Sequence, residues 1–137
     1  MSEQRVGFVG AGQMAQALAC GFVQANLVEP SRITAYDPVP AALEALSKSV
    51  QGLRRATGNR QVVEESDVVF LAVKPQHMNP AIADLRPAVS HSKLFVSIAA
   101  GIPLSRLCDH LGTGRVIRVM PNTPCLVGRG ASGFSLG

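Results

Sequence analysis

Residues 5–15 read Arg-Val-Gly-Phe-Val-Gly-Ala-Gly-Gln-Met-Ala, and this stretch decides the fold class. A short apolar run typical of a buried strand passes directly into a helical pattern, and the turn between them matches G-x-G-x-x-G/A. In that motif Gly10 makes the tight turn, Gly12 lets the backbone approach a pyrophosphate, and the small Ala15 allows close packing of helix on strand. The stretch therefore predicts a dinucleotide-binding loop. The alternative is a glycine-rich turn that needs only a positive φ.

Strand-like and helical segments alternate along the rest of the chain. We expect strands at 5–9, 32–36, 52–56, 67–73, 93–98 and 115–119, and helices at 12–25, 41–48, 59–65 and 104–111. Another helix follows Pro75, is interrupted near Pro80 and stops by Pro87. The alternation predicts an α/β, Rossmann-type doubly wound fold. Its mainly parallel sheet would have strand order 3-2-1-4-5-6, with helices on both faces.

Finer features of the elements follow from single residues. Met14, Leu18 and Phe22 recur at spacings of four, so we expect them on one face of the first helix. Asn59 is a good N-cap for the short third helix. The segment 126–136 is glycine-rich and is expected to be extended.

The composition excludes several classes of protein. The 137 residues are 47% apolar and 16% charged, and 13 Lys and Arg against 9 Asp and Glu give a net charge of +4. Such a chain forms a core in one domain and is not intrinsically disordered. It has no apolar run of about 18 residues, so we expect no membrane partner. The basic residues are scattered and aromatic residues make up 4%, so we expect no nucleic-acid partner.

The cysteines and histidines suggest neither a disulfide scaffold nor a metal site. Three cysteines without close spacing, and an N-terminus without a secretory signal, favour a cytoplasmic location. The three histidines have no second ligand at metal spacing, and we expect them at the surface or at helix ends. They are His77, His91 and His110.

Asp37 ends the second expected strand, where a carboxylate can accept hydrogen bonds from both ribose hydroxyls of NAD. Its charge would repel the 2′-phosphate of NADP, although Arg32 and Lys48 are near enough in sequence to meet that phosphate. The alternative is a simple Asp37-Pro38 turn. Both interpretations remain open at this stage.

Three further loops follow strands and carry candidate ligand contacts. Lys74, held extended by the proline after it, could reach a phosphate or ribose, or it could be a solvated lysine. The small residues 97–101 leave room for a flat ring, or they form a tight turn. In the loop 121–124, Asn122 and Thr123 offer groups suited to a carboxamide or carboxylate, or they satisfy their own backbone.

Four motifs together resemble pyrroline-5-carboxylate reductases over the whole chain. They are residues 6–15 (VGFVGAGQMA), 70–76 (FLAVKPQ), 96–102 (VSIAAGI) and 115–124 (RVIRVMPNTP). The resemblance implies reduction of 1-pyrroline-5-carboxylate, a cyclic imine carboxylate, to L-proline in proline biosynthesis, with NADPH or NADH as cofactor. The protein would supply orientation and electrostatics, and the cofactor the chemistry.

The resemblance also implies roles for individual residues. Gly10, Gly12, Gln13 and Met14 would hold the pyrophosphate, and Asp37 would face the adenosine ribose. The nucleotide channel would be lined by Ala72, Val73, Lys74 and Pro75. The nicotinamide ring would lie between Ala99, Ala100 and Asn122.

Members of that family are about twice as long, with a C-terminal helical domain that contacts substrate and forms a homo-oligomer. We therefore expect residues 1–137 to be the single NAD(P)-binding domain, inactive alone, with the catalytic contacts in the second domain. Two rival functions are another Rossmann-type reductase, such as a β-hydroxyacid dehydrogenase, and a non-catalytic NAD(P)-sensing module. A purely structural α/β domain is a third possibility.

Overall fold

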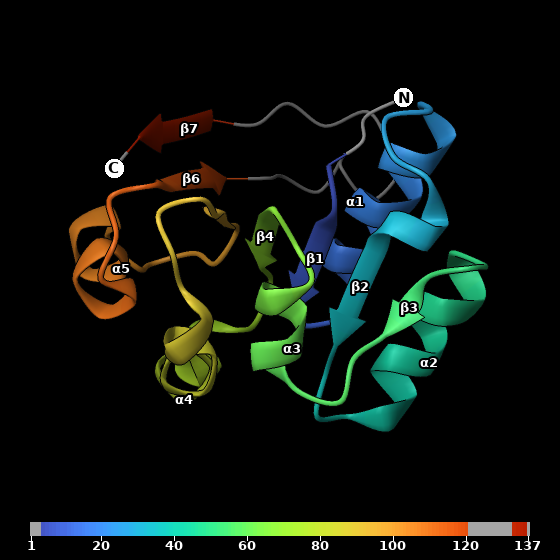
Figure 1. Ribbon diagram of the computed structural model, residues 1–137, viewed down its shortest axis with the longest axis horizontal. Helices are drawn as coiled ribbons and strands as arrows, with labels where there is room; N and C mark the ends of the chain where they lie inside the picture. Colours follow the sequence, from blue (N-terminus) through green and yellow to red (C-terminus); the bar gives the residue numbers. More distant parts are fainter. Residues whose placement is uncertain (1–3, 121–132, 137) are drawn as a thin grey trace.

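The computed structural model describes residues 4–120 and 133–136, which form one twisted sheet with helices on both faces (Figure 1). The strand order is β3-β2-β1-β4-β5-β6-β7. The first six strands are parallel, and β7 pairs with β6 in the antiparallel sense. The strands are β1 (Val6–Val9), β2 (Ile33–Tyr36), β3 (Arg54–Arg55), β4 (Val68–Leu71), β5 (Leu94–Ser97), β6 (Val116–Met120) and β7 (Gly133–Leu136). The doubly wound order expected from the sequence is confirmed.

The helices connect successive strands. The α-helices are α1 (Gln13–Gln24), α2 (Pro40–Ser49), α3 (Asn59–Glu64), α4 (Met78–Leu85) and α5 (Leu104–Leu111). Three short 3₁₀ turns accompany them: η1 (Pro30–Arg32), η2 (Pro75–His77) and η3 (Arg86–Ala88). None of the helices in the described part of the chain has the length and apolar character needed to cross a bilayer.

The core consists of two layers, one on each face of the sheet. Successive residues of a strand point to opposite faces, so Phe8 enters one layer and Val9 the other. The Phe8 layer is covered by α1 and α2, and the Val9 layer by α3, α4 and α5. The helices thus cover the two faces of the sheet, and parallel sheets of this kind bind ligands where their strands end.

The buried face of α1 is centred on alanines, with Leu18 and Phe22 packed beside them. The fully buried residues are Ala15 and Ala19, whereas Met14, Leu18 and Phe22 are only partly buried. Small side chains at the centre let the helix approach β1 closely, and larger ones fit only at the flanks of the contact. The spacing of large apolar residues therefore identified the neighbouring stripe.

Three local expectations were wrong. The third strand is shorter than the expected 52–56. It consists of Arg54–Arg55 at the edge of the sheet, and both side chains are exposed. The N-cap of α3 is Gly58, and Asn59 is the first helical residue, with its side chain buried. Pro80 does not interrupt α4, because it lies in the first turn, where its missing N–H has no helical acceptor to lose.

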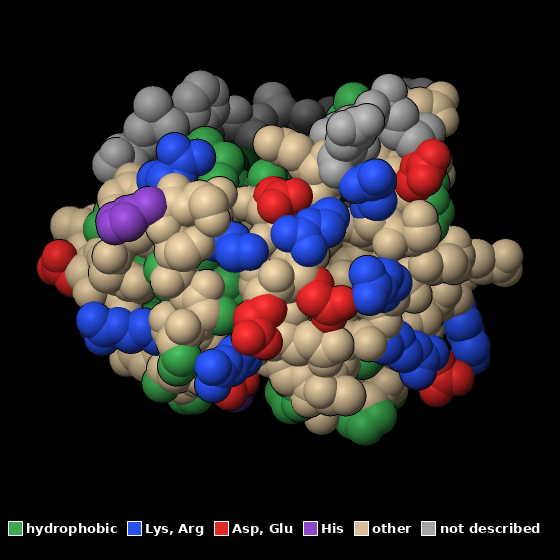
Figure 2. Space-filling view, viewed as in Figure 1, with side chains coloured by type: hydrophobic (Ala, Val, Ile, Leu, Met, Phe, Trp, Pro, Cys, Tyr) green, Lys and Arg blue, Asp and Glu red, His purple; other side chains and the backbone are tan. Residues whose placement is uncertain are grey.

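Other expectations are confirmed. Helix α5 covers the residues expected and ends at Gly112, whose φ of 75° suits a glycine C-cap. The extended tail is present at Gly133–Leu136, and the rest of 126–136 lies outside the described residues. In the face shown in Figure 2, Lys and Arg side chains are interspersed with Asp and Glu.

An ion pair joins the amino ends of β1 and β4. Arg5 Nη2 lies 3.2 Å from Asp67 Oδ1, and the Arg5 backbone N–H donates to Asp67 Oδ2 at 2.9 Å. Hydrogen bonds from the Arg5 side chain, and then from its backbone, hold the pKa of Asp67 below its ordinary value.

We expect Asp67→Asn to lower the free energy of unfolding at pH 7 by less than about 1 kcal/mol, because exposed ion pairs contribute little. The two side chains are 44% and 39% exposed. A pKa that is lower in the folded state gives stability that is complete above about pH 4 and is lost as the pH falls through the folded-state pKa. Urea unfolding at pH 7 and at steps below pH 5 should therefore show the free energies of unfolding of Asp67→Asn and the unmodified chain becoming equal as the pH falls. A difference in free energy of unfolding that stays constant down to pH 2 would contradict this account.

Candidate functional site

A cleft of about 510 Å³ opens at the carboxyl ends of β1, β2 and β4. The strand order changes direction at β1 and β4, and parallel α/β sheets bind ligands at such a point. One wall is the turn after β2, another is the turn after β4, and α4 closes the side. The lining residues are Gly12, Tyr36, Asp37, Pro38, Val39, Asn59, Ala72, Val73, Lys74, His77, Pro80, Ala81 and Asp84.

The glycine loop is held between the ends of β2 and β4. The Gly10 N–H donates to the Tyr36 carbonyl at 2.9 Å, and the Ala72 N–H donates to the Val9 carbonyl at 2.8 Å. Gly10 has a φ of 102°, and a Cβ built on it would lie 2.8 Å from the Ala72 carbonyl oxygen. Glycine is therefore required at position 10 by both conformation and space.

Gly12 has a different role from Gly10. Its φ of −74° suits any residue, and a Cβ built on it would meet nothing within 4 Å. It is the N-cap of α1 and lines the cleft, so the space a side chain would enter belongs to the cleft. The turn glycine expected at position 10 is present, and the close approach of a pyrophosphate at Gly12 stays a prediction.

The start of α1 fits a phosphate group. No side chain caps the helix, and its first turn holds no acidic residue. The backbone N–H groups of that turn have no acceptor within the helix, and the helix dipole makes this end favourable for an anion. The bare Gly12 beside them leaves room for a diphosphate to approach the backbone. These residues therefore fit the pyrophosphate of a dinucleotide.

Asp37 links the turn after β2 to the glycine loop. Its Oδ2 accepts the Ala11 N–H at 2.8 Å, and its Oδ1 accepts the Val39 N–H at 2.8 Å. The second bond is the Asp turn considered from the sequence. The first bond was not anticipated, because it joins residues that the sheet alone brings together.

Of the residues expected to line a nucleotide channel, Ala72, Val73 and Lys74 line this cleft. Lys74 is exposed and extended, with φ −63° and ψ 150°, as expected of a residue before proline. Pro75 opens η2 and does not line the cleft in the described structure.

The other expected residues are not gathered in this cleft. Gln13 is exposed and Met14 is partly buried, both in the first turn of α1 beside it. Ala99 is buried and Ala100 exposed after β5, where Ser97 Oγ accepts the Ala99 N–H at 3.4 Å. Gly101 then has a φ of 78°, so the tight turn considered for 97–101 is present. Asn122 and Thr123 lie outside the described residues.

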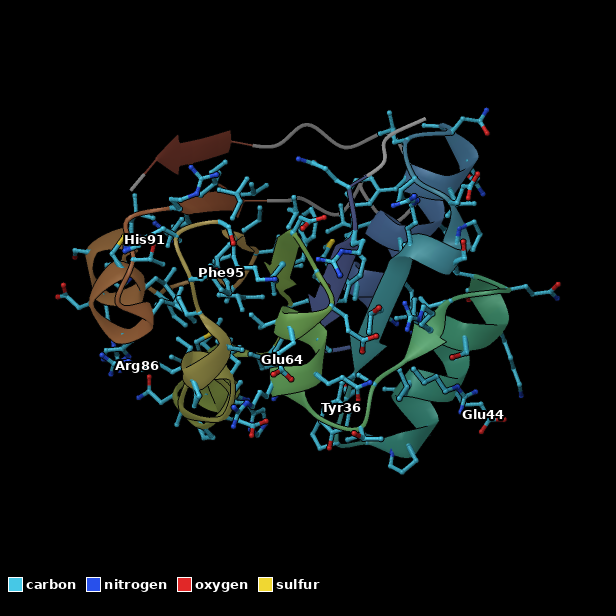
Figure 3. The ribbon with its side chains drawn as sticks, viewed as in Figure 1. Tyr36, Glu44, Glu64, Arg86, His91 and Phe95 are labelled. Carbon is cyan, nitrogen blue, oxygen red and sulfur yellow. The ribbon has the colours of Figure 1, made fainter. Side chains whose placement is uncertain are left out.

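Sequence reasoning missed two groups of lining residues. Tyr36, Pro38 and Val39 flank Asp37, and their position after a strand was a usable signal; Figure 3 places Tyr36 where β2 ends, between α2 and α3. Asn59 and the residues of α4 line the cleft because α3 and α4 pack beside the carboxyl ends of the strands. No local sequence pattern reveals that packing. His77 is exposed as expected, but it lies on the cleft wall. The lining residues from η2 and α4 are His77, Pro80, Ala81 and Asp84.

Other chemistry is not supported within residues 4–120 and 133–136. No three His, Cys, Asp or Glu side chains of this part are grouped so that they could hold a metal ion. Cys20 and Cys108 are free thiols, both partly buried.

Comparison with known proteins shows what the chain is similar to. Residues 5–101 match the family model described as NADP oxidoreductase, coenzyme F420-dependent. A pyrroline-5-carboxylate reductase of Methanosarcina acetivorans is 43% identical over the whole chain, which covers 51% of that relative. The chain thus spans about half the length of the curated relatives it matches.

Two solved structures resemble the fold closely. A pyrroline-5-carboxylate reductase from Coxiella burnetii has a TM-score of 0.90 and 30% identity, and the match covers 99% of this chain and 50% of that one. A pyrroline carboxylate reductase of Plasmodium falciparum, described with NADP bound, has a TM-score of 0.84 and 33% identity. That match covers 100% of this chain and 49% of the other.

Proposed function

The chain belongs to the family described as NADP oxidoreductase, coenzyme F420-dependent, and from that membership we propose that it is the nucleotide-binding part of a pyrroline-5-carboxylate reductase. The reaction is the reduction of 1-pyrroline-5-carboxylate to L-proline with NADPH or NADH. The observation that carries the proposal is the cleft at the switch point, where an uncapped helix start, an acid after β2 and the turn after β4 meet.

We assign the described residues roles in binding and orientation. The α1 start and Gly12 hold the pyrophosphate, with Gly10 shaping the loop and Gln13 and Met14 in the same turn. Asp37 faces the adenosine ribose, and residues 72–75 border the nucleotide. Ala99, Ala100 and Asn122 are assigned to the nicotinamide end, as the family resemblance implies.

The cofactor, when bound, supplies a hydride to the imine carbon, and a proton completes the amine of proline. The chain's own residues fix where the nucleotide lies. The imine substrate and its proton source are assigned to the half of the relatives that these residues do not span. A cytoplasmic location and a homo-oligomeric full-length enzyme, both expected from the sequence, belong to the same proposal.

A fluorescence titration of the 137-residue chain with NADH and with NADPH tests the binding assignment. Saturable binding of either nucleotide is expected, without proline formation by this chain alone. If neither nucleotide binds up to millimolar concentration, the assignment of the cleft is wrong. Robust proline formation by the isolated chain would instead overturn the assignment of substrate contacts to the other half.

A further inference from the structure

We propose that Asp37 makes this cleft selective for NADH over NADPH, by accepting the ribose hydroxyls and repelling a 2′-phosphate. The inference rests on the proposed function, because it concerns the same cleft and the same cofactor class.

The Asp37 carboxylate is already fixed in place. Each of its oxygens accepts one backbone N–H at 2.8 Å, from Ala11 and from Val39. A carboxylate oxygen offers two acceptor positions, so one position on each oxygen is left by these bonds. Asp37 lines the cleft and is partly exposed to it. Two adjacent acceptors of this kind suit the 2′- and 3′-hydroxyls of an unphosphorylated ribose.

The two cations that the sequence placed near Asp37 lie elsewhere. Arg32 precedes β2 and lines a separate polar pocket with Arg5 and Arg54, whereas Asp37 follows the other end of β2. Lys48 lies 3.4 Å from Glu44 on the solvent side of α2, and its side chain is 77% exposed. Figure 3 shows Glu44 pointing outward, away from Tyr36 and the end of β2. Neither cation lines the cleft beside Asp37.

Lys74 is the one Lys or Arg among the described residues that line the cleft. It follows β4, and β1 lies between β4 and β2. Two strand spacings, about 9–10 Å, therefore separate the backbone positions after β2 and β4. The cleft also holds a second acid, Asp84. A 2′-phosphate at the end of β2 meets the Asp37 charge at closer range than the Lys74 charge.

The size of the expected preference follows from electrostatics. A phosphate monoester carries close to two negative charges at neutral pH. Its repulsion from a carboxylate about 4 Å away, in a partly solvated cleft, corresponds to at least about a tenfold weaker Kd.

The experiment is a parallel titration of the 137-residue chain with NADH and NADPH, followed by nicotinamide fluorescence. We expect NADH to bind at least about tenfold more tightly than NADPH. Asp37→Asn removes the charge and should bring the Kd values for NADH and NADPH to within about threefold of each other. Most of this change should come from tighter binding of NADPH. Lys74→Met is the matched control, and it should weaken both nucleotides without changing their ratio.

The carboxylate also holds two backbone N–H groups, so Asp37→Asn is checked by thermal unfolding before it is titrated. A measurement on the unmodified chain does not depend on that variant: 5′-AMP should displace bound NADH at lower concentration than adenosine 2′,5′-bisphosphate. If the unmodified chain binds NADPH more tightly than NADH, and Lys74→Met loses that preference, this inference is overturned and the proposed function stays intact. Absence of binding by either nucleotide would overturn the proposed function itself.

Discussion

Replacing Gly12 by alanine is expected to leave the fold intact and to weaken nucleotide binding by about 5–150-fold. The added methyl group meets nothing within 4 Å in the protein, and the φ of −74° suits alanine. It occupies the space where the backbone of the α1 start meets the diphosphate. Overpacking of this kind costs about 1–3 kcal/mol, which here falls on the complex and not on the free protein.

The measurement is a NADH titration of Gly12→Ala together with a urea unfolding curve. The matched control is Gly21→Ala, a glycine near the C-terminal end of α1 whose Cβ also meets nothing within 4 Å. That control should gain about 0.5–1 kcal/mol of stability and keep its affinity. Equal affinity in Gly12→Ala and the unmodified chain would mean that the diphosphate does not approach this helix start.

Gly10→Ala is expected to lower the free energy of unfolding by about 2–6 kcal/mol, the sum of backbone strain and overpacking. Gly10 has a φ of 102°, and its added Cβ would lie 2.8 Å from the Ala72 carbonyl oxygen and 2.9 Å from the Ala72 carbonyl carbon. Both neighbours are backbone atoms just after β4, so a change of side-chain rotamer cannot relieve the clash. Domains are commonly stable by only about 5–15 kcal/mol, so this loss would remove a large fraction of the free energy of unfolding.

Urea unfolding of Gly10→Ala beside Gly12→Ala provides the test, because the two glycines are two residues apart and only the first is confined. An unfolding midpoint for Gly10→Ala equal to that of the unmodified chain would show that the glycine loop shifts freely. The contrast between the two variants separates what the loop does for folding from what it does for binding.

The general fold could be predicted because its signals are local and repeated. Apolar runs alternate with helical patterns, and right-handed crossovers leave few ways to connect them. The glycine motif then identified the first strand and helix, and the four motifs identified the resemblance to pyrroline-5-carboxylate reductases. The comparisons confirm that resemblance.

The errors have a common physical cause: contacts between distant segments. The buried positions of α1 are alanines because β1 lies close beneath them, which spacing of large residues cannot reveal. Asn59 is a favourable cap in isolation, yet Gly58 occupies that position and the Asn59 side chain lines the cleft. The wall formed by α4 likewise depends on how that helix crosses the sheet edge. Tertiary packing thus overrode local preference at each of these positions.

The bonds around the glycine loop also bear on the kinetics of binding. The loop is tied to β2 through Tyr36 and Asp37, and β4 is tied to β1 at Val9, before any nucleotide arrives. Ordering of this segment is therefore completed during folding, and the encounter with a nucleotide requires no slow rearrangement of the loop. Association should depend linearly on nucleotide concentration, and differences in affinity among variants of this loop should appear chiefly as differences in residence time.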